Sequence, residues 1–315
     1  MEAQLEKPNL EVFAQTLLEL AQRDKDILVV TSDSRGSGKL VPFGDALPDQ
    51  IIEVGIAEQN LVGIAAGLAS CGKKVFAVSP ASFLTARALE HIKNDIAYSD
   101  VPVTLVGISA GVSYGALGST HHSLHDIAAL RAIHNIDIII PGDNAETRAA
   151  VIAAVDHPRP LFLRFGKRPL PHLYTGNFTF DIGKANMLSE GNDVALIATG
   201  ETVVQARQAA QQLEERHIAV RVISMHTIKP LDADAVLQAA KECRLILTVE
   251  EHSACGGLGE ACATIILQAG LSPRFRAIAI PDEDTVPGAQ LEIFKHYGLT
   301  ADGLVSTILK LLKTI

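Results

Sequence analysis

The 315-residue sequence has no apolar run long enough to cross a membrane, since a spanning helix needs about 20 consecutive apolar residues. It also begins without the basic segment, apolar stretch and small-residue cleavage site that mark secretion. Cysteine is scarce, and Cys71, Cys243, Cys255 and Cys262 lack the close paired spacing of zinc or redox motifs. We therefore expect a cytoplasmic protein with free thiols and no membrane partner.

Positive charge is in short supply as well. The formal net charge is −9, and the 27 lysines and arginines are scattered rather than gathered into one stripe. A protein that binds a phosphate backbone needs such a stripe, so we expect no nucleic-acid partner. The length corresponds to two domains of about 150 residues, each able to bury a core.

The first half of the chain alternates short β-branched segments with helical patterns. Leu10, Phe13 and Leu17 recur at helical spacing, and a buried strand follows at 27–31. Helical stretches at 61–71 and 84–98 separate further strands. This alternation is typical of a parallel sheet with helices on both faces, its other strands lying at 51–54, 74–78, 103–108, 136–140 and 161–164.

A proline-rich stretch then interrupts the pattern, because Pro169 and Pro171 disfavour helix and Gly176-Asn177 favours a turn. A second alternating set follows it, with strands at 194–199, 219–224, 245–249 and 276–280 and helices at 202–216, 233–243 and 259–269. The predicted fold class is α/β with two three-layer domains, over residues 1–168 and 181–315, joined by a linker at 169–180.

Glu58 is the first candidate site residue. It follows a predicted strand and begins a helix rich in small residues, among them Gly63, Ala65 and Gly67. A carboxylate at a helix start is often only a surface residue that favours the helix dipole. From this segment alone both interpretations stay open.

The ordered set of short motifs resembles the C-terminal half of transketolases, which bind thiamine diphosphate. Each motif is weak alone, but together they span nearly the whole chain. The motifs are TSD at 31–33, EVGIAEQNLVGIAAGLAS at 53–70, ASFL at 81–84, GSTHH at 118–122, PLFLR at 160–164, SMHTIKPL at 224–231, TVEEH at 248–252 and GGLG at 256–259. The resemblance implies a pyrimidine-binding domain followed by a transketolase C-terminal-like domain.

The resemblance implies that Glu58 is catalytic and binds the cofactor, by donating a hydrogen bond to the aminopyrimidine ring. Such a donor must hold its proton, and small apolar neighbours suit this role because burial disfavours an ionised carboxyl. Phe83 matches an aromatic that packs on the same ring, worth about 0.5–1.5 kcal/mol beyond burial. A plain core phenylalanine is the alternative for Phe83.

The first loop, after the strand at 27–31, carries two further candidates. The resemblance places Asp33 near the cofactor's thiazolium ring and Ser37 near the sugar phosphate. A turn-forming Asp-Ser pair explains these residues equally well.

The loop at 109–123 carries His121, which matches a histidine near the reacting carbonyl or hydroxyl, where imidazole donates a hydrogen bond or moves a proton. Ser123 is the expected N-cap of the next helix. The family's histidine and aspartate upstream of His121 are replaced by Ser109 and Leu117, so the substrate is left open. Arg164 matches an arginine that binds the sugar phosphate, with a structural salt bridge as the alternative.

Metal-binding residues are not expected in this chain. His121 and His125 are four residues apart, but no carboxylate completes a helix-borne zinc pattern. The Gly-Asp-Gly segment with which thiamine-diphosphate enzymes hold Mg²⁺ is absent. The most similar segment is PGDN at 141–144, and its Asp143 is interpreted as a helix N-cap. The Mg²⁺ and the cofactor's diphosphate should therefore be held by another polypeptide.

The favoured interpretation is the pyrimidine-binding subunit of a split transketolase. It would pair with a diphosphate-binding N-terminal subunit, dimerise within a two-plus-two complex, and transfer ketol groups between sugar phosphates. One alternative is the beta subunit of a 2-oxo acid dehydrogenase. Another is a catalytically silent regulatory or nucleotide-binding partner using the glycine turn at 256–259, which lacks a full dinucleotide fingerprint. The sugars, the partner's identity and the role of the C-terminal domain stay open.

Overall fold

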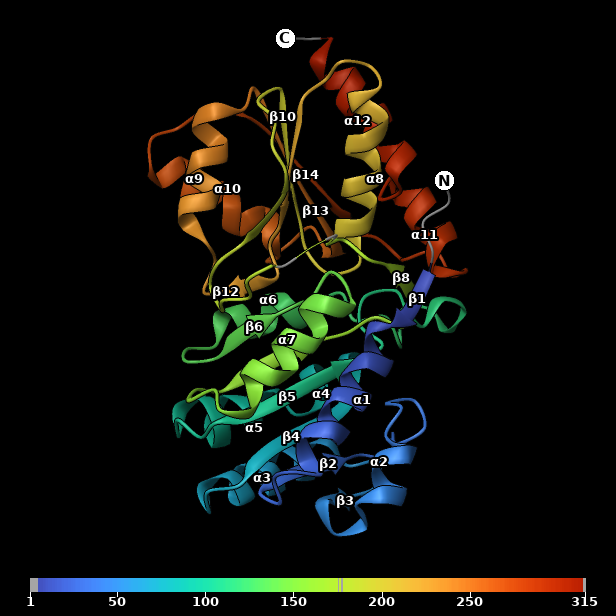
Figure 1. Ribbon diagram of the computed structural model, residues 1–315, viewed down its shortest axis with the longest axis vertical. Helices are drawn as coiled ribbons and strands as arrows, with labels where there is room; N and C mark the ends of the chain where they lie inside the picture. The colour runs from blue at the N-terminus through green and yellow to red at the C-terminus, as the bar shows by residue number, and fades with distance from the viewer. Residues whose placement is uncertain (1–4, 175, 177, 314–315) are drawn as a thin grey trace.

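The computed structural model describes residues 5–174, 176 and 178–313. The chain forms two α/β domains stacked along the long axis of the molecule, with the N-terminal domain below and the C-terminal domain above in Figure 1. Residues 175 and 177 of the predicted linker lie outside the described residues. No helix among the described residues is long and apolar enough to cross a membrane.

A seven-stranded sheet forms the centre of the N-terminal domain. Neighbouring strands pair in parallel, except that β12 from the second half of the chain adds an antiparallel strand at one edge. The strand order is β12 (Thr227–Lys229), β6 (Asp137–Ile139), β7 (Leu161–Arg164), β5 (Val103–Ile108), β4 (Lys74–Pro80), β2 (Ile27–Thr31) and β3 (Ile51–Glu53).

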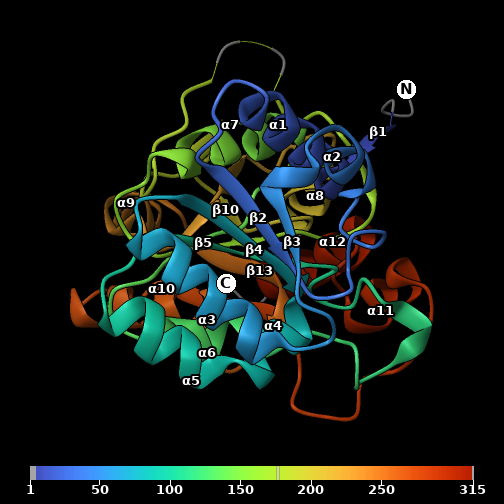
Figure 2. The same cartoon turned by 90° about the horizontal axis from the view of Figure 1, so that it is seen from below.

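Helices cover both faces of this sheet, as Figure 2 shows. On one face α1 (Asn9–Ala21) and α7 (Asn144–Val155) pack with Phe13 and Val151 in one apolar core. On the other face lie α3 (Glu58–Ser70), α4 (Ala81–Arg87), α5 (Leu89–His91) and α6 (Asp126–Ala132). Asp143 is the N-cap of α7, accepting from the Glu146 N–H at 2.9 Å, as predicted.

The C-terminal domain has a five-stranded sheet, parallel except for β9. Helices α8 (Thr202–Glu214), α11 (Gln290–Tyr297) and α12 (Ala301–Leu312) enclose one core, while α9 (Ala233–Glu242) and α10 (Leu258–Gln268) cover the opposite face. The strand order is β14 (Arg274–Ile280), β13 (Leu245–Ser253), β10 (Val194–Ala198), β11 (Val220–Ser224) and β9 (Asn186–Ser189).

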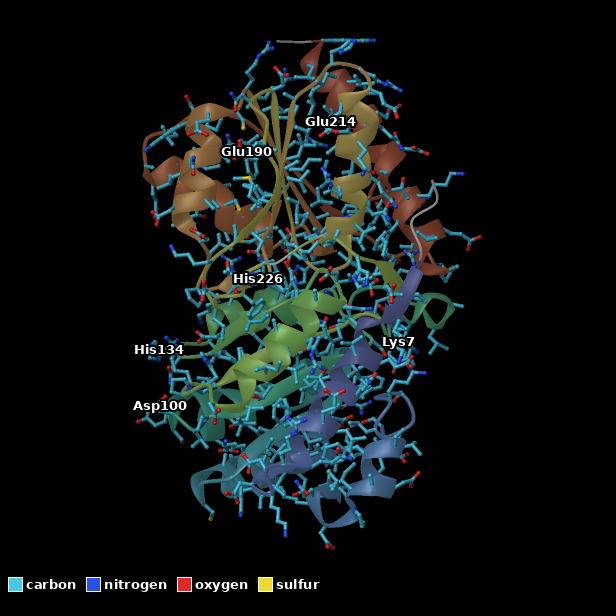
Figure 3. All side chains as sticks on the ribbon, viewed as in Figure 1. Lys7, Asp100, His134, Glu190, Glu214 and His226 are labelled. Carbon is cyan, nitrogen blue, oxygen red and sulfur yellow. The ribbon has the colours of Figure 1, made fainter. Side chains whose placement is uncertain are left out.

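The two domains meet through the carboxyl ends of their strands. The Ile140 N–H donates to the His226 carbonyl at 2.7 Å, and the Ser224 hydroxyl donates to Glu146 at 2.8 Å. His226 is fully buried at this junction (Figure 3), stacked on Phe180 with ring centroids 4.4 Å apart. A two-stranded ribbon of β1 (Leu5–Pro8) and β8 (Pro169–Pro171) lies beside the junction.

The predicted fold class is confirmed, and several differences in detail have local causes. The predicted helix at 84–98 is instead three pieces, because α4 ends at Arg87 and a π-helix over Ile92–Tyr98 follows α5. Ser123 is not the N-cap of α6, because its backbone pairs with Gly111 across the loop and the helix begins only at Asp126. The short elements α2 (Val41–Ala46), β1, β8, β9 and β12 and the last two helices were not predicted.

Candidate active site

A cavity of about 210 Å³ opens beyond the carboxyl ends of β2, β3 and β4. In open α/β sheets this is where ligands bind, because loops leaving the strands diverge there and expose polar groups. The residues that line the cavity come from the end of β4, from the loops and helix starts that follow these three strands, and from one further loop: Ser32, Asp33, Ser34, Ser37, Ile56, Glu58, Pro80, Phe83 and Tyr114.

Glu58 is the first residue of α3 and lines the cavity although its own exposed fraction is only 2%. A surface residue that merely favours the helix dipole would be exposed, so that alternative is wrong. The short link from β3 to α3 fixes the position of this carboxylate at the cavity wall. A buried carboxylate aimed at a cavity is suited to bind and to exchange a proton with a ligand.

Arg87 is a partner of Glu58 that the sequence analysis missed. Its Nη1 donates to both carboxylate oxygens of Glu58, at 3.0 and 3.1 Å, and its guanidinium carbon lies 4.2 Å from the centroid of Phe83. The sequence predicted small apolar surroundings for Glu58. The structure corrects this, because a guanidinium group is also present. The missed signal is spacing, because Arg87 follows Phe83 by four residues and so lies on the same face of α4.

His121 lies at the rim of the cavity, against two of the rings that line it. It contacts both Phe83 and Tyr114 edge-on, with centroids 5.3 Å apart in each case. The Thr120 hydroxyl lies 2.9 Å from Nδ1 of His121. The structure thus brings Glu58, Phe83 and His121 together, and adds Tyr114, the only tyrosine in the loop at 109–123.

Asp33 and Ser37 both line the cavity from the loop after β2. Asp33 has φ = 51°, and its N–H donates to Oε1 of Glu53 at 2.6 Å. Ser37 donates to the carbonyl of Ser34 at 3.2 Å. Ser37 therefore bonds within the turn that was the alternative interpretation, Asp33 is held by β3, and both residues also line the cavity. Glu53, which orders this turn, was not predicted.

Arg164 does not lie at the cavity, in contrast to the expected role in binding phosphate. It is 6% exposed at the domain junction, where Nε donates to Asp126 at 2.8 Å. Its Nη2 donates to the carbonyls of Ser123 at 3.1 Å and Glu251 at 3.0 Å. The geometry is that of the structural salt bridge left open by the sequence, because Arg164 and the carboxylate of its partner Asp126 are both buried.

Lys167 provides a cation where Arg164 does not. It follows Arg164 by three residues, and its Nζ lies 4.6 Å from the centroid of Tyr114, at the cavity rim. Burial lowers the pKa of Lys167, and the nearby Lys39 lowers it further. Lys167 and Lys39 therefore lie near each other, and Ser37 lines the same cavity. Such a group of side chains is suited to bind an anion.

The two family departures lie in different settings. Ser109 is buried with φ = 54°, whereas Leu117 is 55% exposed on the loop. Among the described residues, no group of three or more His, Cys, Asp and Glu side chains is placed to hold a metal ion. The cavity thus has a buried carboxylate, aromatic rings and hydroxyls, and these groups fit a flat heteroaromatic ring. They do not form the cluster of oxygen ligands that a cofactor-bound cation needs.

The fold and this cavity define one half of a thiamine-diphosphate enzyme, the half that receives the pyrimidine ring. Family models agree: residues 8–172 match the transketolase pyrimidine-binding domain, and residues 183–304 match the transketolase C-terminal domain. The chain belongs to the transketolase family.

Curated relatives of the same length identify the kind of member. The chain is 50% identical to a subunit of the apulose-4-phosphate transketolase of Phocaeicola vulgatus over 303 residues, covering 96% of each chain. It is 34% identical to 6-deoxy-6-sulfo-D-fructose transketolase subunit SqwH of a Clostridium species, covering 94% of this chain and 91% of that protein.

A solved structure described as a split gene transketolase, inactive beta4 tetramer, superposes with a TM-score of 0.86 at 33% identity, covering 96% of this chain and 97% of that one. These matches favour transketolase over a 2-oxo acid dehydrogenase. The chain is therefore the pyrimidine-binding subunit of a split transketolase, a thiamine-diphosphate-dependent transferase.

Proposed function

We propose that this chain and a separate diphosphate-binding subunit together transfer a two-carbon ketol unit between sugar phosphates. The observation that carries the proposal is the buried Glu58 carboxylate at a cavity fitted to a ring, in a chain whose described residues hold no metal-binding cluster. The partner would hold Mg²⁺ and the cofactor's diphosphate, since oxygen ligands for that ion have to come from elsewhere.

Glu58 would meet a nitrogen of the pyrimidine ring and hold a proton there, with Phe83 packed on the ring. When bound, thiamine diphosphate supplies a carbon nucleophile that attacks the donor's carbonyl group. In the chain alone both Glu58 oxygens are engaged by Arg87. Because each carboxyl oxygen has a second lone pair, Glu58 can meet the ring nitrogen while Arg87 keeps the group oriented.

The remaining cavity residues divide between the reacting end and the distant end of the sugar. His121, held beside Phe83 and Tyr114, would donate a hydrogen bond or move a proton at the substrate's oxygen. Asp33 would lie near the positively charged ring of the cofactor. Ser37 and Lys167, with Lys39 nearby, would bind the phosphate group, because a lysine ammonium binds phosphate as a point charge.

For the assembly we propose two copies of this chain and two partner subunits. The support is the related split transketolase, described as an inactive tetramer of beta chains, which indicates that such chains self-associate without being active. We place the complex in the cytoplasm, because sugar phosphates are anions that do not enter a bilayer unaided.

Co-expression with candidate partner subunits, followed by a donor and acceptor screen, tests the proposal. Apulose 4-phosphate belongs in that screen, because the relative at 50% identity is named for it. We expect ketol transfer by the complex, and neither tight cofactor binding nor turnover by this chain alone. Tight binding of thiamine diphosphate together with ketol transfer by the isolated chain would refute the split site.

A further inference from the structure

The loop between β5 and α6 carries Tyr114 and His121 to the cavity, and its two ends are tied together. Ser123 donates its N–H to the Gly111 carbonyl at 2.8 Å, closing the base of the loop. The tip between these residues includes Leu117, which is 55% exposed. The orientation of the tip therefore depends on what holds the base.

The base of the loop is held by the C-terminal domain. Val112 donates its N–H to Oε1 of Glu251 on β13 at 2.8 Å, and Ser253 donates its N–H to the Leu124 carbonyl at 3.1 Å. The approach is so close that a Cβ on Gly111, which has φ = +62°, would overlap the carboxyl carbon of Glu251. Only glycine leaves room for the carboxyl group here.

Glu251 is itself held by Gln290, which Glu201 holds in turn. Gln290 at the start of α11 donates through Nε2 to Glu251 at 2.7 Å and to Glu201, just before α8, at 2.8 Å. The segment before α11 also contacts the loop directly, because a Cβ on Gly115 would lie 2.5 Å from the Gly288 carbonyl oxygen. The loop thus contacts two separate parts of the second domain, β13 and the segment before α11.

We propose that Glu251 is a positioning residue for catalysis, through which the C-terminal domain holds the loop that places His121 and Tyr114 at the cavity. The catalytic role of these two residues rests on the proposed function, whereas the clamp of Glu251, Val112 and Gln290 is a property of the isolated chain. This assigns a role to the C-terminal domain, whose described residues, up to 313, include none that line the cavity.

The clamp should respond to pH. Burial and the adjacent Glu201 together raise the pKa of Glu251 to about 8, although Arg164 and the hydrogen bonds from Val112 and Gln290 lower it. The charged and titratable groups around Glu251 are Glu201 before α8, Arg164 on β7, Asp126 on α6, and Glu250 and His252 on β13. As the pH rises past about 8, ionisation would place a charge on Glu251 inside the buried junction beside Glu201, so the clamp should loosen and turnover should fall.

Glu250 provides a matched control on the same strand. It is equally buried, and its carboxylate accepts from the Leu258 and Gly259 N–H groups at 2.7 and 2.8 Å, entirely within its own domain. Glu251→Ala and Glu250→Ala should therefore lower the melting temperature comparably. Only Glu251→Ala should release the loop.

Hydrogen exchange on the isolated chain measures the loop directly. We expect the amides of 112–122 to exchange at least about tenfold faster in Glu251→Ala, and at the parent rate in Glu250→Ala. Unchanged exchange in Glu251→Ala would overturn the proposal. If that variant does not fold, Gln290→Met replaces it, because this change removes the side-chain hydrogen bond to Glu251. Exchange of the same amides must then be faster than in the parent, or the proposal fails.

Kinetics on the co-expressed complex test the catalytic consequence. Glu251→Ala should lower kcat about tenfold or more, since small displacements of catalytic groups are costly, and Glu250→Ala should not. Glu251→Gln mimics the protonated acid, so it should restore kcat at neutral pH and remove the fall above pH 8. Equal losses for both alanine variants, or a parental alkaline fall in Glu251→Gln, would contradict the role. A parent complex without ketol transfer would refute the proposed function while leaving the exchange result to stand.

Discussion

The carboxyl edge of the seven-stranded sheet has an open half and a covered half. Beyond β2, β3 and β4 the loops surround a cavity, while beyond β5, β6 and β7 the same edge is covered by the strand ends of the second domain. Both halves carry buried carboxylates. Among the described residues, Glu58 in the open half pairs with one partly exposed arginine, whereas Glu250 and Glu251, on the facing strand β13 of the second domain, each accept from two protein donors.

This contrast shows that the carboxyl ends of parallel strands can form either a ligand-sized cavity or a domain interface, depending on what covers them. Groups in the covered half are desolvated, and burial raises the pKa of Glu250 to about 7 and that of Glu251 to about 8. Residue type alone does not distinguish the two halves. Variants in each half should therefore differ in whether turnover or stability is lost.

The largest effect on turnover should come from Glu58→Gln in the open half. Because the amide cannot supply a carboxyl proton to the ring nitrogen, ketol transfer by the complex should fall about 10²- to 10⁴-fold. The melting temperature should stay close to that of the parent. Exposed Glu90 serves as the control, and Glu90→Gln should retain full turnover. Exchange of the cofactor's C2 proton at the parental rate in Glu58→Gln would show that Glu58 has been misassigned.

The largest effect on stability should come from Arg164→Met in the covered half. The change leaves Asp126 buried without its cation, which costs about 3–5 kcal/mol of unfolding free energy. Urea denaturation of the isolated chain measures this loss. If the variant keeps its stability and instead loses affinity for phosphorylated sugars only, Arg164 binds substrate after all.

A smaller and selective effect is expected for Lys167, at the rim of the open half. Lys167→Met should lower kcat/KM about ten- to a hundredfold for phosphorylated sugars, corresponding to one charge-assisted bond of about 1.5–3 kcal/mol. Unphosphorylated sugars should be affected much less. Exposed Lys25 after α1 is the matched control, and equal losses on both kinds of sugar would assign Lys167 a structural role.

The smallest effect is on the pH dependence of stability. The pKa of Glu251 is raised in the folded state, so its neutral form stabilises the fold at low pH and that contribution is lost as the pH rises toward 8. Below pH 6.5 the lowered pKa values of His226 and His252, both about 4, act in the opposite direction. Between pH 6.5 and 8 the parent should lose up to about 2 kcal/mol relative to Glu251→Gln. Parallel curves for the two proteins in urea titrations would contradict the raised pKa.

The sequence predicted the elements whose side chains are buried along their whole length. The strands β2, β5 and β7 were placed to the residue, because contiguous β-branched and apolar residues mark a strand covered on both faces. The strand β12 was missed, because its three residues form a strand only by pairing with β6. Such pairing is a tertiary contact that no local pattern carries.

Part of the candidate site could be located from the sequence, and part could not. Glu58, Phe83, Asp33 and Ser37 lie in short motifs directly after strands, and all four line the cavity. The resemblance named Arg164 as the phosphate ligand and Lys167 was not considered, because only the packing of the second domain shows that Arg164 is buried while Lys167, three residues later, lies against Tyr114.

The strand β12 has a consequence for how the chain unfolds. Because Thr227–Lys229 completes the sheet of the N-terminal domain, separating the domains would remove an edge strand from that sheet and expose the backbone of β6. An exposed edge pairs readily with other chains. The two domains should therefore behave as a single cooperative unit, and a fragment that ends after β8 should aggregate rather than persist as an independent module.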